Sequence, residues 1–370
     1  MSAAPGTAAA QCIAARDGLA PWSAETDDEL LCVALHDETA DVRSFTFAPR
    51  SASRFHYLPG QFLTFDIPTE RGIVQRCYTI ASSPTRPDRL TITVKRQRGG
   101  IVSPWLHDHL RPGMSLRALG PMGDFTFAAS PTRTDPHLFI SGGSGITPLM
   151  SMTRAHYDLA PETDIVFLHF ARTPDDIIFR DELALMARTM PNLRIIAVCE
   201  ADSPGTRWGG PRGRVDATML KLLVPDLATR TIFNCGPAPF MAAIRAALPT
   251  LGVDRVNYHE ESFDFATLND AAPETQASPN NITTSFAVNF TKSARSIDIA
   301  ADQFILAAAR AAGMRLPSSC TKGMCGTCKS KLLSGHVDMQ HQGGIRQREI
   351  DQGMILICCA RPLSDLVIER

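Results

Sequence analysis

Cysteine spacing near the end of the chain is the strongest chemical signal in the sequence. The loop PSSCTKGMCGTCKS places Cys320, Cys325 and Cys328 at C-x4-C-x2-C. Three thiolates at this spacing, with a fourth cysteine farther along, are the ligand pattern of a plant-type [2Fe–2S] cluster. The fourth ligand is expected within ILICCARP, which holds Cys358 and Cys359. A structural zinc site is the alternative, although zinc sites usually combine two close-spaced ligand pairs.

A run around residue 76 indicates flavin chemistry. In QRCYTIASSP, Arg76 and Tyr78 alternate along an expected strand and so share a face, and Thr79 follows them. A guanidinium can hold a phosphate with two hydrogen bonds, and a phenol ring can cover an isoalloxazine. The Thr79 hydroxyl can then reach the flavin N5. An ordinary barrel strand would also explain this run.

A second run, KRQRGGIVSPWLHD, supplies groups for a pyrophosphate. Gly100 permits close approach of the backbone, and a helix is expected to begin near Pro104. The backbone amides of Ile101 and Val102 and the hydroxyl of Ser103 would then point at the phosphates, as amides at helix starts commonly do.

Two glycine-containing turns indicate a nicotinamide dinucleotide. In SGGSGITPLM, Gly143, Gly145 and Pro148 follow a strand and open a helix, the setting of a dinucleotide fingerprint. Thr147 is expected to cap this helix, with Pro148 at its first position. The second turn, NCGPAPFM, contains Cys235, Gly236 and Pro237. Its alternative interpretation is a helix-starting turn with a buried cysteine.

The choice between NADH and NADPH depends on the end of the next strand, HFARTPDD. Arg172 there could hold a 2′-phosphate, whereas an acidic residue would bind a ribose 2′-hydroxyl. Asp175 and Asp176 stand close by, so the residues alone leave both dinucleotides open.

The elements that position these groups follow from hydrophobic patterning. Short β-like runs between residues 30 and 96 predict a small antiparallel β-barrel. From residue 137, strands and helices alternate strictly, which predicts a doubly wound parallel sheet. A polar stretch is followed by two strands, a helix, the cysteine loop and two short strands. We expect a flexible arm, a flavin barrel, a nicotinamide domain, a linker and an iron–sulfur domain at residues 1–27, 28–130, 131–266, 267–282 and 283–370.

Composition limits the classes of partner and compartment. The 370 residues include 37 Lys+Arg and 38 Asp+Glu, a formal net charge of −1, which argues against a nucleic-acid binder. No apolar run approaches the roughly 18 residues that cross a bilayer, and the first residues lack the features of a secretory signal. We therefore expect a cytoplasmic protein with no membrane or nucleic-acid partner and no disulfide scaffold.

Together these motifs resemble two known families. R-x-Y-T with the GGIVS element resembles the FAD branch of the ferredoxin–NADP reductase superfamily, with FMN as the alternative. The resemblance implies that Cys235-Gly236-Pro237 lies beside the nicotinamide and that Glu261 and Phe263 match a closing E-x-F. It implies catalytic roles for Thr79, Cys235 and Glu261. The C-terminal part resembles plant-type ferredoxins of the β-grasp fold, whose C-x-x-x-P pattern selects Cys358, four residues before Pro362. We expect Cys359 on the opposite face of the same strand.

The order of the modules resembles the reductase components of Rieske-type N-demethylating monooxygenases, which act on glycine betaine, stachydrine or carnitine. It implies transfer of electrons from NADH through FAD and one [2Fe–2S] cluster to a terminal Rieske-type oxygenase subunit. NADPH is the alternative donor. There are two alternative functions. One is a reductase for another acceptor, such as a hybrid-cluster protein, and the other is a pure electron-carrier module.

Overall fold

The computed structural model describes residues 19–24, 27–70, 72–127, 135–263, 284–318, 323, 326–341, 345 and 347–370. The chain divides into two compact units, one of residues 1–74 and 78–263 and one of residues 75–77 and 264–370. Among the described residues, no helix is long and apolar enough to cross a membrane.

A six-stranded antiparallel sheet forms the first part of the first unit, apart from residues 75–77 of its strand β6, which group with the second unit. Its strands pair in the order β6-β5-β8-β2-β3-β7, and a bridge between Ile80 and Ile92 joins the two ends of the sheet into a barrel. Alternate side chains, such as Phe45, Phe47 and Phe65, fill the barrel and are fully buried. The strands are β2 (Glu29–Thr39), β3 (Val42–Pro49), β5 (Phe62–Thr69), β6 (Gly72–Thr79), β7 (Leu90–Lys95) and β8 (Ser115–Met122).

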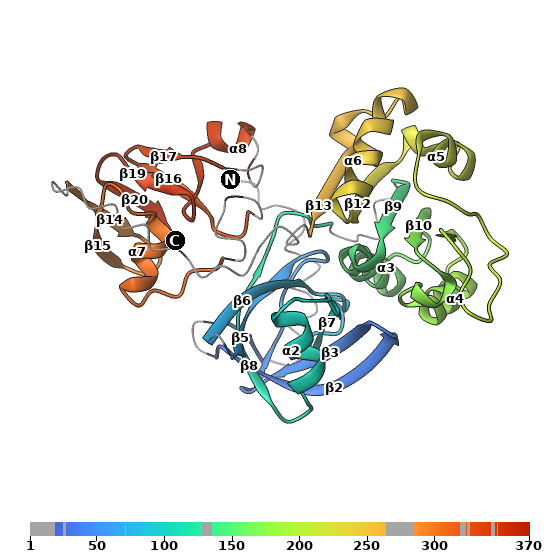
Figure 1. Ribbon diagram of the computed structural model, residues 1–370, viewed down its shortest axis with the longest axis horizontal. Coiled ribbons are helices and arrows are strands. Elements are labelled where there is room, and N and C mark those ends of the chain that lie inside the picture. Colours follow the sequence, from blue (N-terminus) through green and yellow to red (C-terminus); the bar gives the residue numbers. More distant parts are fainter. Residues whose placement is uncertain are drawn as a thin grey trace. The chain divides into compact units, whose positions relative to one another are not determined.

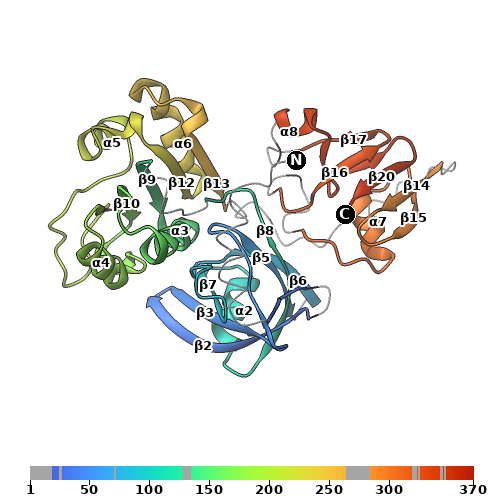
Figure 2. The same cartoon turned by 180° about the vertical axis from the view of Figure 1, so that it is seen from behind.

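One helix and a short strand pair complete the barrel. Helix α2 (Val102–His109) lies against it in both views and inserts Val102 and Leu106 into its core (Figure 2). Strand β1 (Ala20–Pro21) pairs with β4 (Ser53–Arg54). The expectation of a loose arm up to residue 27 is wrong at this point. Trp22 is 5% exposed because its ring packs on Phe55, with centroids 5.5 Å apart.

The second part of the first unit is a parallel sheet in the order β11-β10-β9-β12-β13, as the alternating pattern predicted. Helices α3 and α4 cover one face and α5 and α6 the other (Figure 1). The elements are β9 (His137–Gly142), α3 (Ile146–Leu159), β10 (Ile165–Ala171), α4 (Arg180–Thr189), β11 (Leu193–Cys199), α5 (Ala217–Leu223), β12 (Thr231–Gly236), α6 (Ala238–Ala247) and β13 (Tyr258–Ser262), with 3-10 turns η1 (Gly143–Gly145), η2 (Pro174–Asp176), η3 (Leu227–Thr229), η4 (Leu248–Leu251) and η5 (Arg255–Asn257).

The start of α3 differs from its prediction. The N-cap is Gly145 with no side-chain cap, and Pro148 is the third helical residue. Thr147 is already inside the helix, and its hydroxyl donates to the Ser144 carbonyl at 3.2 Å. The 3-10 turn η1 leads directly into α3, so the helix needs no separate capping side chain.

The second unit combines a mixed sheet with one packed helix. The sheet order is β15-β14-β20-β16-β18, and β17 pairs with β19 separately. Helix α7 buries Ile305, Leu306 and Ala309 in the core below the sheet. The elements are β14 (Ser285–Phe290), β15 (Arg295–Ala300), α7 (Ile305–Ala311), β16 (Lys329–Ser334), β17 (Val337–Met339), α8 (Gln347–Asp351), β18 (Met354–Leu356), β19 (Ala360–Pro362) and β20 (Leu366–Glu369). The predicted linker, residues 267–282, lies outside the described residues.

Candidate functional site

The two glycine-containing turns meet at one edge of the parallel sheet. They follow β9 and β12, which are neighbours at the centre of the sheet although three strands apart along the chain. This is the point where the strand order reverses, and ligands of open α/β sheets bind beside the carboxyl ends of such strands.

Backbone packing explains the glycines of these turns. A Cβ on Gly145 would lie 2.3 Å from the Cys235 carbonyl oxygen, so only glycine lets the first turn rest on the second. A Cβ on Gly236 would lie 2.6 Å from the Phe240 ring. Gly143 has a φ of +53°, and a Cβ there would meet no atom within 4 Å among the described residues. The first turn therefore presents bare backbone to open space, which fits a pyrophosphate.

Strand register places a row of polar side chains across the sheet behind the turns. Cys235 pairs in register with Glu261 on one side and with Ser141 on the other, and Ser141 pairs with His169. Residues paired in register on parallel strands share a face. Ser141 Oγ lies 2.7 Å from His169 Nδ1, and both side chains are fully buried.

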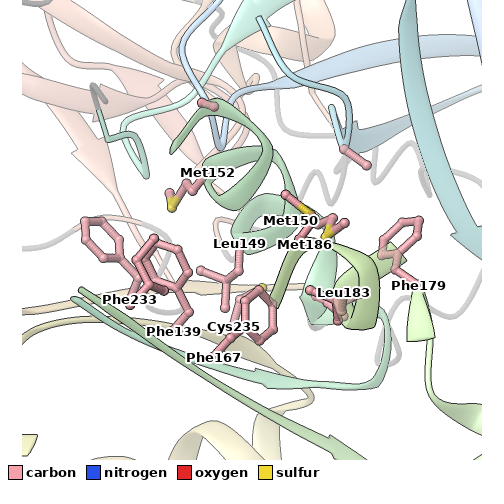
Figure 3. Packing of buried hydrophobic residues seen from close by; sticks show 14 of the residues in the cluster. Phe139, Leu149, Met150, Met152, Phe167, Phe179, Leu183, Met186, Phe233 and Cys235 are labelled. Atoms are coloured by element: carbon pink, nitrogen blue, oxygen red, sulfur yellow. The ribbon is translucent and has the colours of Figure 1, made fainter. Parts of the chain in front are cut away.

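The electrostatics of this row keep it neutral. Burial, with a smaller contribution from the nearby Asp124 charge, raises the pKa of Glu261 to about 8. Burial and the neighbouring Glu261 raise the pKa of the Cys235 thiol well above its usual value. Glu261 Oε2 is buried and has no hydrogen-bond partner among the described residues, so it is available to a bound polar group. Figure 3 shows Cys235 beside Phe167 in the core beneath.

The predicted flavin strand is β6. Thr79 is buried at its end, and Tyr78 packs on the barrel core, its ring centroid 6.3 Å from that of Phe65. Arg76 Nη1 donates to the Gln75 carbonyl at 2.9 Å. Two residues beyond Thr79, Ala81 belongs to the same apolar cluster as Cys235. The chain therefore passes directly from the flavin strand to the core under the nicotinamide turns.

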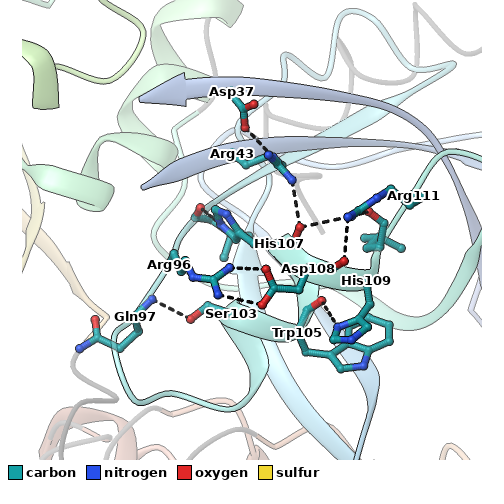
Figure 4. A network of polar contacts seen from close by, with 12 residues as sticks. Asp37, Arg43, Arg96, Gln97, Ser103, Trp105, His107, Asp108, His109 and Arg111 are labelled. Atoms are coloured by element: carbon teal, nitrogen blue, oxygen red, sulfur yellow. Dashed lines mark hydrogen bonds and ion pairs between the residues drawn. The ribbon is translucent and has the colours of Figure 1, made fainter. Parts of the chain in front are cut away.

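The predicted pyrophosphate loop leads into α2, which begins at Val102, earlier than expected from Pro104. The backbone amide of Gln97 donates to Ser103 Oγ at 2.9 Å (Figure 4). Arg96 forms two bonds with Asp108, at 2.6 and 2.8 Å. These contacts fix the loop at both ends.

The first-turn amides of α2 are available to an anion. Amides at the start of a helix have no partner within the helix. Ile101 is the N-cap, and the Val102 side chain points into the barrel, so these two residues contribute only backbone. The loop fits a phosphate group.

Arg172 does not stand alone at the end of β10. Its Nη2 lies 2.5 Å from Asp176 Oδ1 and 3.2 Å from Asp41 Oδ2. Thr173 Oγ1 donates to the other Asp176 oxygen at 2.8 Å. Two carboxylates thus compete with any phosphate for this guanidinium.

The candidate metal centre is described in part. Cys328 and Cys358 are buried, and Cys320 and Cys325 lie outside the described residues. The expectation that Cys358 and Cys359 occupy opposite faces of a strand is wrong. They lie in a turn between β18 and β19, and both are buried, with the Cys359 thiol donating to the Leu356 carbonyl at 3.5 Å. Buried thiols beside a loop with positive-φ glycines fit a cluster.

A partly buried arginine, Arg370, supports the described part of the cysteine loop. Arg370 Nη1 donates to the Lys329 carbonyl at 3.0 Å and Nη2 to the Thr327 carbonyl at 3.4 Å. These two residues flank Cys328. Burial lowers the pKa of the Arg370 guanidinium, and its interaction with Cys328 opposes that shift.

Comparison with known proteins agrees with this division. Residues 32–127, 139–246 and 288–363 match the oxidoreductase FAD-binding domain, the oxidoreductase NAD-binding domain and the 2Fe-2S iron-sulfur cluster binding domain. The chain is 42% identical to the glycine betaine monooxygenase reductase subunit of Chromohalobacter salexigens, over 91% of this chain and 94% of that protein. The chain belongs to the family of three-domain oxygenase reductases. It is an oxidoreductase with FAD, one [2Fe–2S] cluster and NADH.

Two further proteins extend the comparison. The reductase is 41% identical to the stachydrine N-demethylase reductase subunit of Rhizobium meliloti, over 92% of this chain and 96% of that protein. Its fold matches phthalate dioxygenase reductase with a TM-score of 0.55 and 24% identity, covering 94% of this chain and all of that one. The antiparallel barrel, parallel sheet and ferredoxin-like domain are therefore confirmed.

The structure brings some predicted residues together and adds others. Cys235, Gly236 and Glu261 meet Gly145 at the sheet edge, and Phe263 packs against the same core. Sequence patterns missed Asp124, Ser141, His169 and Phe240, because their importance depends on strand order and register. Of the two carboxylates that contact Arg172, the sequence indicated Asp176, which stands four residues away. It did not indicate Asp41, which is distant in the chain.

Proposed function

We propose that the reductase delivers electrons from NADH to a Rieske-type oxygenase that N-demethylates a betaine-like quaternary amine in the cytoplasm. The observation that carries this proposal is the 41–42% identity, over more than nine-tenths of the chain, to reductase subunits of a glycine betaine monooxygenase and a stachydrine N-demethylase. When bound, flavin converts the two-electron chemistry of NADH into the one-electron steps of an iron–sulfur cluster.

In this proposal, β6 and the start of α2 hold the flavin. Arg76 binds a phosphate, Tyr78 covers the ring system, and Thr79 donates its hydroxyl toward the ring. The amides after Gly100, together with Ser103, bind the pyrophosphate. Because Ser103 Oγ already accepts from the Gln97 amide, its own proton remains for a phosphate oxygen.

The sheet edge holds the nicotinamide dinucleotide. Gly143 and Gly145 admit the pyrophosphate at the start of α3, with Thr147 and Pro148 shaping its first turn. Gly236 and Pro237 would shape the second turn. Phe263, which packs against the core beneath that turn, would lie near the flavin. Excluding water here strengthens every electrostatic contact within the site.

Cys235 and Glu261 form the polar part of the reacting centre. The carboxyl of Glu261 holds a proton at neutral pH, because burial raises its pKa to about 8. A neutral acid can donate a hydrogen bond where a carboxylate would repel electron density. The Cys235 thiol stays protonated for the same reason.

We propose that the carboxylates around Arg172 account for the use of NADH rather than NADPH. Arg172 is engaged by Asp176 and Asp41, so a 2′-phosphate would have to displace two carboxylates. Asp176 is instead suited to accept a hydrogen bond from a ribose 2′-hydroxyl.

Cys320, Cys325, Cys328 and Cys358 are the proposed cluster ligands. The domain boundaries at residues 130 and 266 are proposals too, since residues 128–134 and 264–283 lie outside the described chain.

Reconstitution tests the proposed function. Purified reductase, NADH and the Rieske oxygenase encoded in the same genome are combined with glycine betaine, stachydrine or carnitine. Oxidative loss of an N-methyl group releases formaldehyde, which is measured against reactions lacking the reductase. Formaldehyde formed in step with NADH consumption is expected. NADH-dependent ferricyanide reduction without any demethylation would contradict the proposed partner.

A further inference from the structure

Helix α3 connects the nicotinamide turn to the flavin barrel. Its first residue follows Gly145, while its later turns reach the loop after β6. Ser151 Oγ donates to the Ser82 carbonyl at 2.7 Å, and Arg154 Nη1 donates to the Ala81 carbonyl at 2.6 Å. Ser151 is fully buried and the Arg154 side chain is 12% exposed. Both contacts are therefore shielded from water.

Arg154 also ties α3 to α4. Its Nε and Nη2 donate to the two carboxylate oxygens of Glu182 at 2.8 and 2.5 Å. The guanidinium carbon lies 4.8 Å from the centre of the Phe179 ring. Phe179 precedes α4 with a φ of +57°, a conformation that non-glycine residues adopt rarely and that packing must hold in place. One guanidinium thus joins the barrel loop, α3 and the start of α4.

Neighbouring contacts reinforce the same junction. Asp158, at the end of α3, accepts from Arg86 at 2.9 Å and also from the Thr85 hydroxyl. On the apolar side, a Cβ on Gly60 would lie 2.0 Å from the Phe125 carbonyl oxygen and 2.9 Å from the Met152 methyl. Polar and apolar contacts therefore fix α3 against the barrel over about two turns of the helix, from Ser151 to Asp158.

The contacts around Arg154 lie close to residues of both proposed cofactor sites. A change in these contacts can therefore alter the geometry of the reacting centre. Ala81 lies two residues beyond Thr79, and the buried, continuous helix α3 begins at the dinucleotide turn. A helix transmits a displacement at one end to the other. A misplacement of about 1 Å between reacting groups can cost on the order of a hundredfold in rate.

We propose that Arg154, assisted by Ser151, is a positioning residue that sets the distance between the flavin strand and the dinucleotide turn. It controls the rate at which NADH reduces the flavin and leaves the binding of each cofactor unchanged. This inference rests on the proposed function, because it assumes that the two cofactors occupy β6 and the sheet edge.

Three variants of the holo-reductase test the inference by stopped-flow measurement of flavin reduction. Arg154→Leu removes all three hydrogen bonds, Arg154→Lys retains the charge and reach for one, and Ser151→Ala removes only the Ser82 bond. Arg50→Leu is the control, since it breaks an exposed Arg50–Glu29 pair of 3.1 Å between two residues of the barrel domain. NAD⁺ affinity is measured by equilibrium titration, and flavin content by absorbance.

We expect flavin reduction to slow at least tenfold in Arg154→Leu, by less in Arg154→Lys and Ser151→Ala, and not in Arg50→Leu. NAD⁺ affinity and flavin content should stay within twofold of wild type.

Two results would overturn the inference. One is an unchanged flavin-reduction rate in Arg154→Leu that folds and binds flavin. The other is an equal fall in rate and NAD⁺ affinity, which would mean a general structural role. If Arg154→Leu does not fold, a wild-type rate in both Arg154→Lys and Ser151→Ala overturns it. Failure of NADH to reduce the wild-type flavin would instead contradict the proposed function.

Discussion

The carboxyl group of Glu261 links the site to the stability of the fold. Its pKa is about 8 in the folded protein, against an ordinary value of 4.5. Folding therefore takes up a proton between these values, so the stability that this group contributes is complete below about pH 4.5 and lost as the pH rises through 8. Each pKa unit corresponds to about 1.4 kcal/mol, so the loss amounts to several kcal/mol.

Glu261→Gln should remove this dependence. The variant removes the titration, so the free energy of unfolding of wild type should fall relative to it between pH 5.5 and 8.5. Chemical unfolding of flavin-free protein followed by circular dichroism measures the difference. Buried His156 and His169, whose pKa values burial lowers to about 3 and about 4, affect both proteins equally. Exposed Glu162→Gln serves as the control, and a pH-independent difference between wild type and Glu261→Gln would contradict the argument.

Asp176 provides a second prediction for a single residue. Asp176→Asn leaves Arg172 with one carboxylate partner in place of two, so the guanidinium becomes more available to a 2′-phosphate. Hydrogen bonds to charged groups contribute about 1.5–3 kcal/mol. We therefore expect kcat/KM for NADPH to rise about tenfold and that for NADH to fall, measured with ferricyanide. Adding Arg172→Ala should cancel the gain, and an unchanged preference in Asp176→Asn would place the ribose elsewhere.

At the scale of elements, the turn between β18 and β19 contains both candidates for the fourth cluster ligand, Cys358 and Cys359. Cys359 donates to the Leu356 carbonyl within this turn and lies against Gly323, whose Cβ would be 2.7 Å from its sulfur. We expect Cys358→Ser to abolish the visible and electron paramagnetic resonance spectra of the cluster and Cys359→Ser to retain them. The reverse outcome in the two variants would show that Cys359 is the ligand.

Helices and strands could be predicted from the sequence where apolar side chains repeat with a regular period. HLFISG, residues 137–142, predicts a buried strand and corresponds to β9 with the same bounds. ITPLMSMTRAHYDL, residues 146–159, predicts a helix and is helical throughout as α3, although its start is capped differently from the expectation. The apolar pattern did not predict the bounds of an element where the backbone conformation sets them. The sequence IIFRDELALMAR, residues 177–188, predicts a helix over its whole length, but α4 begins only at Arg180 because Phe179 takes a left-handed conformation. Strands β8 and β16 were missed, since SLRALGPM and KSKLLS lack a clear alternation.

Candidate site residues could be proposed one by one from the sequence, but their spatial arrangement could not. The motifs containing Arg76, Gly145 and Cys235 are local, so spacing identified them. Their neighbours Ser141 and Glu261 join Cys235 only through the strand order β9-β12-β13, which no local pattern encodes. The same holds for Arg154, whose partners Ala81 and Glu182 come from separate elements.

The whole chain is built as two compact units, and this predicts separable activities. In Cys328→Ser the first unit is unaltered, so NADH-dependent ferricyanide reduction should remain within about twofold of wild type. Delivery of electrons to the oxygenase should be lost. The measurement compares ferricyanide reduction with formaldehyde formation in the same preparation, with Cys359→Ser as the control. Full demethylation by Cys328→Ser would show that electrons bypass the cluster.

The packing of Trp22 into the barrel has an optical consequence. The chain has three tryptophans, Trp22, Trp105 and Trp208, and all of them belong to the first unit. Trp22 is buried against Phe55, Trp105 stacks on His109, and Trp208 donates to the Pro211 carbonyl at 2.9 Å. Tryptophan emission therefore originates in the barrel and the parallel sheet alone. The iron–sulfur unit contributes no tryptophan to that emission, and the bleaching of its colour gives a second signal in the same cuvette.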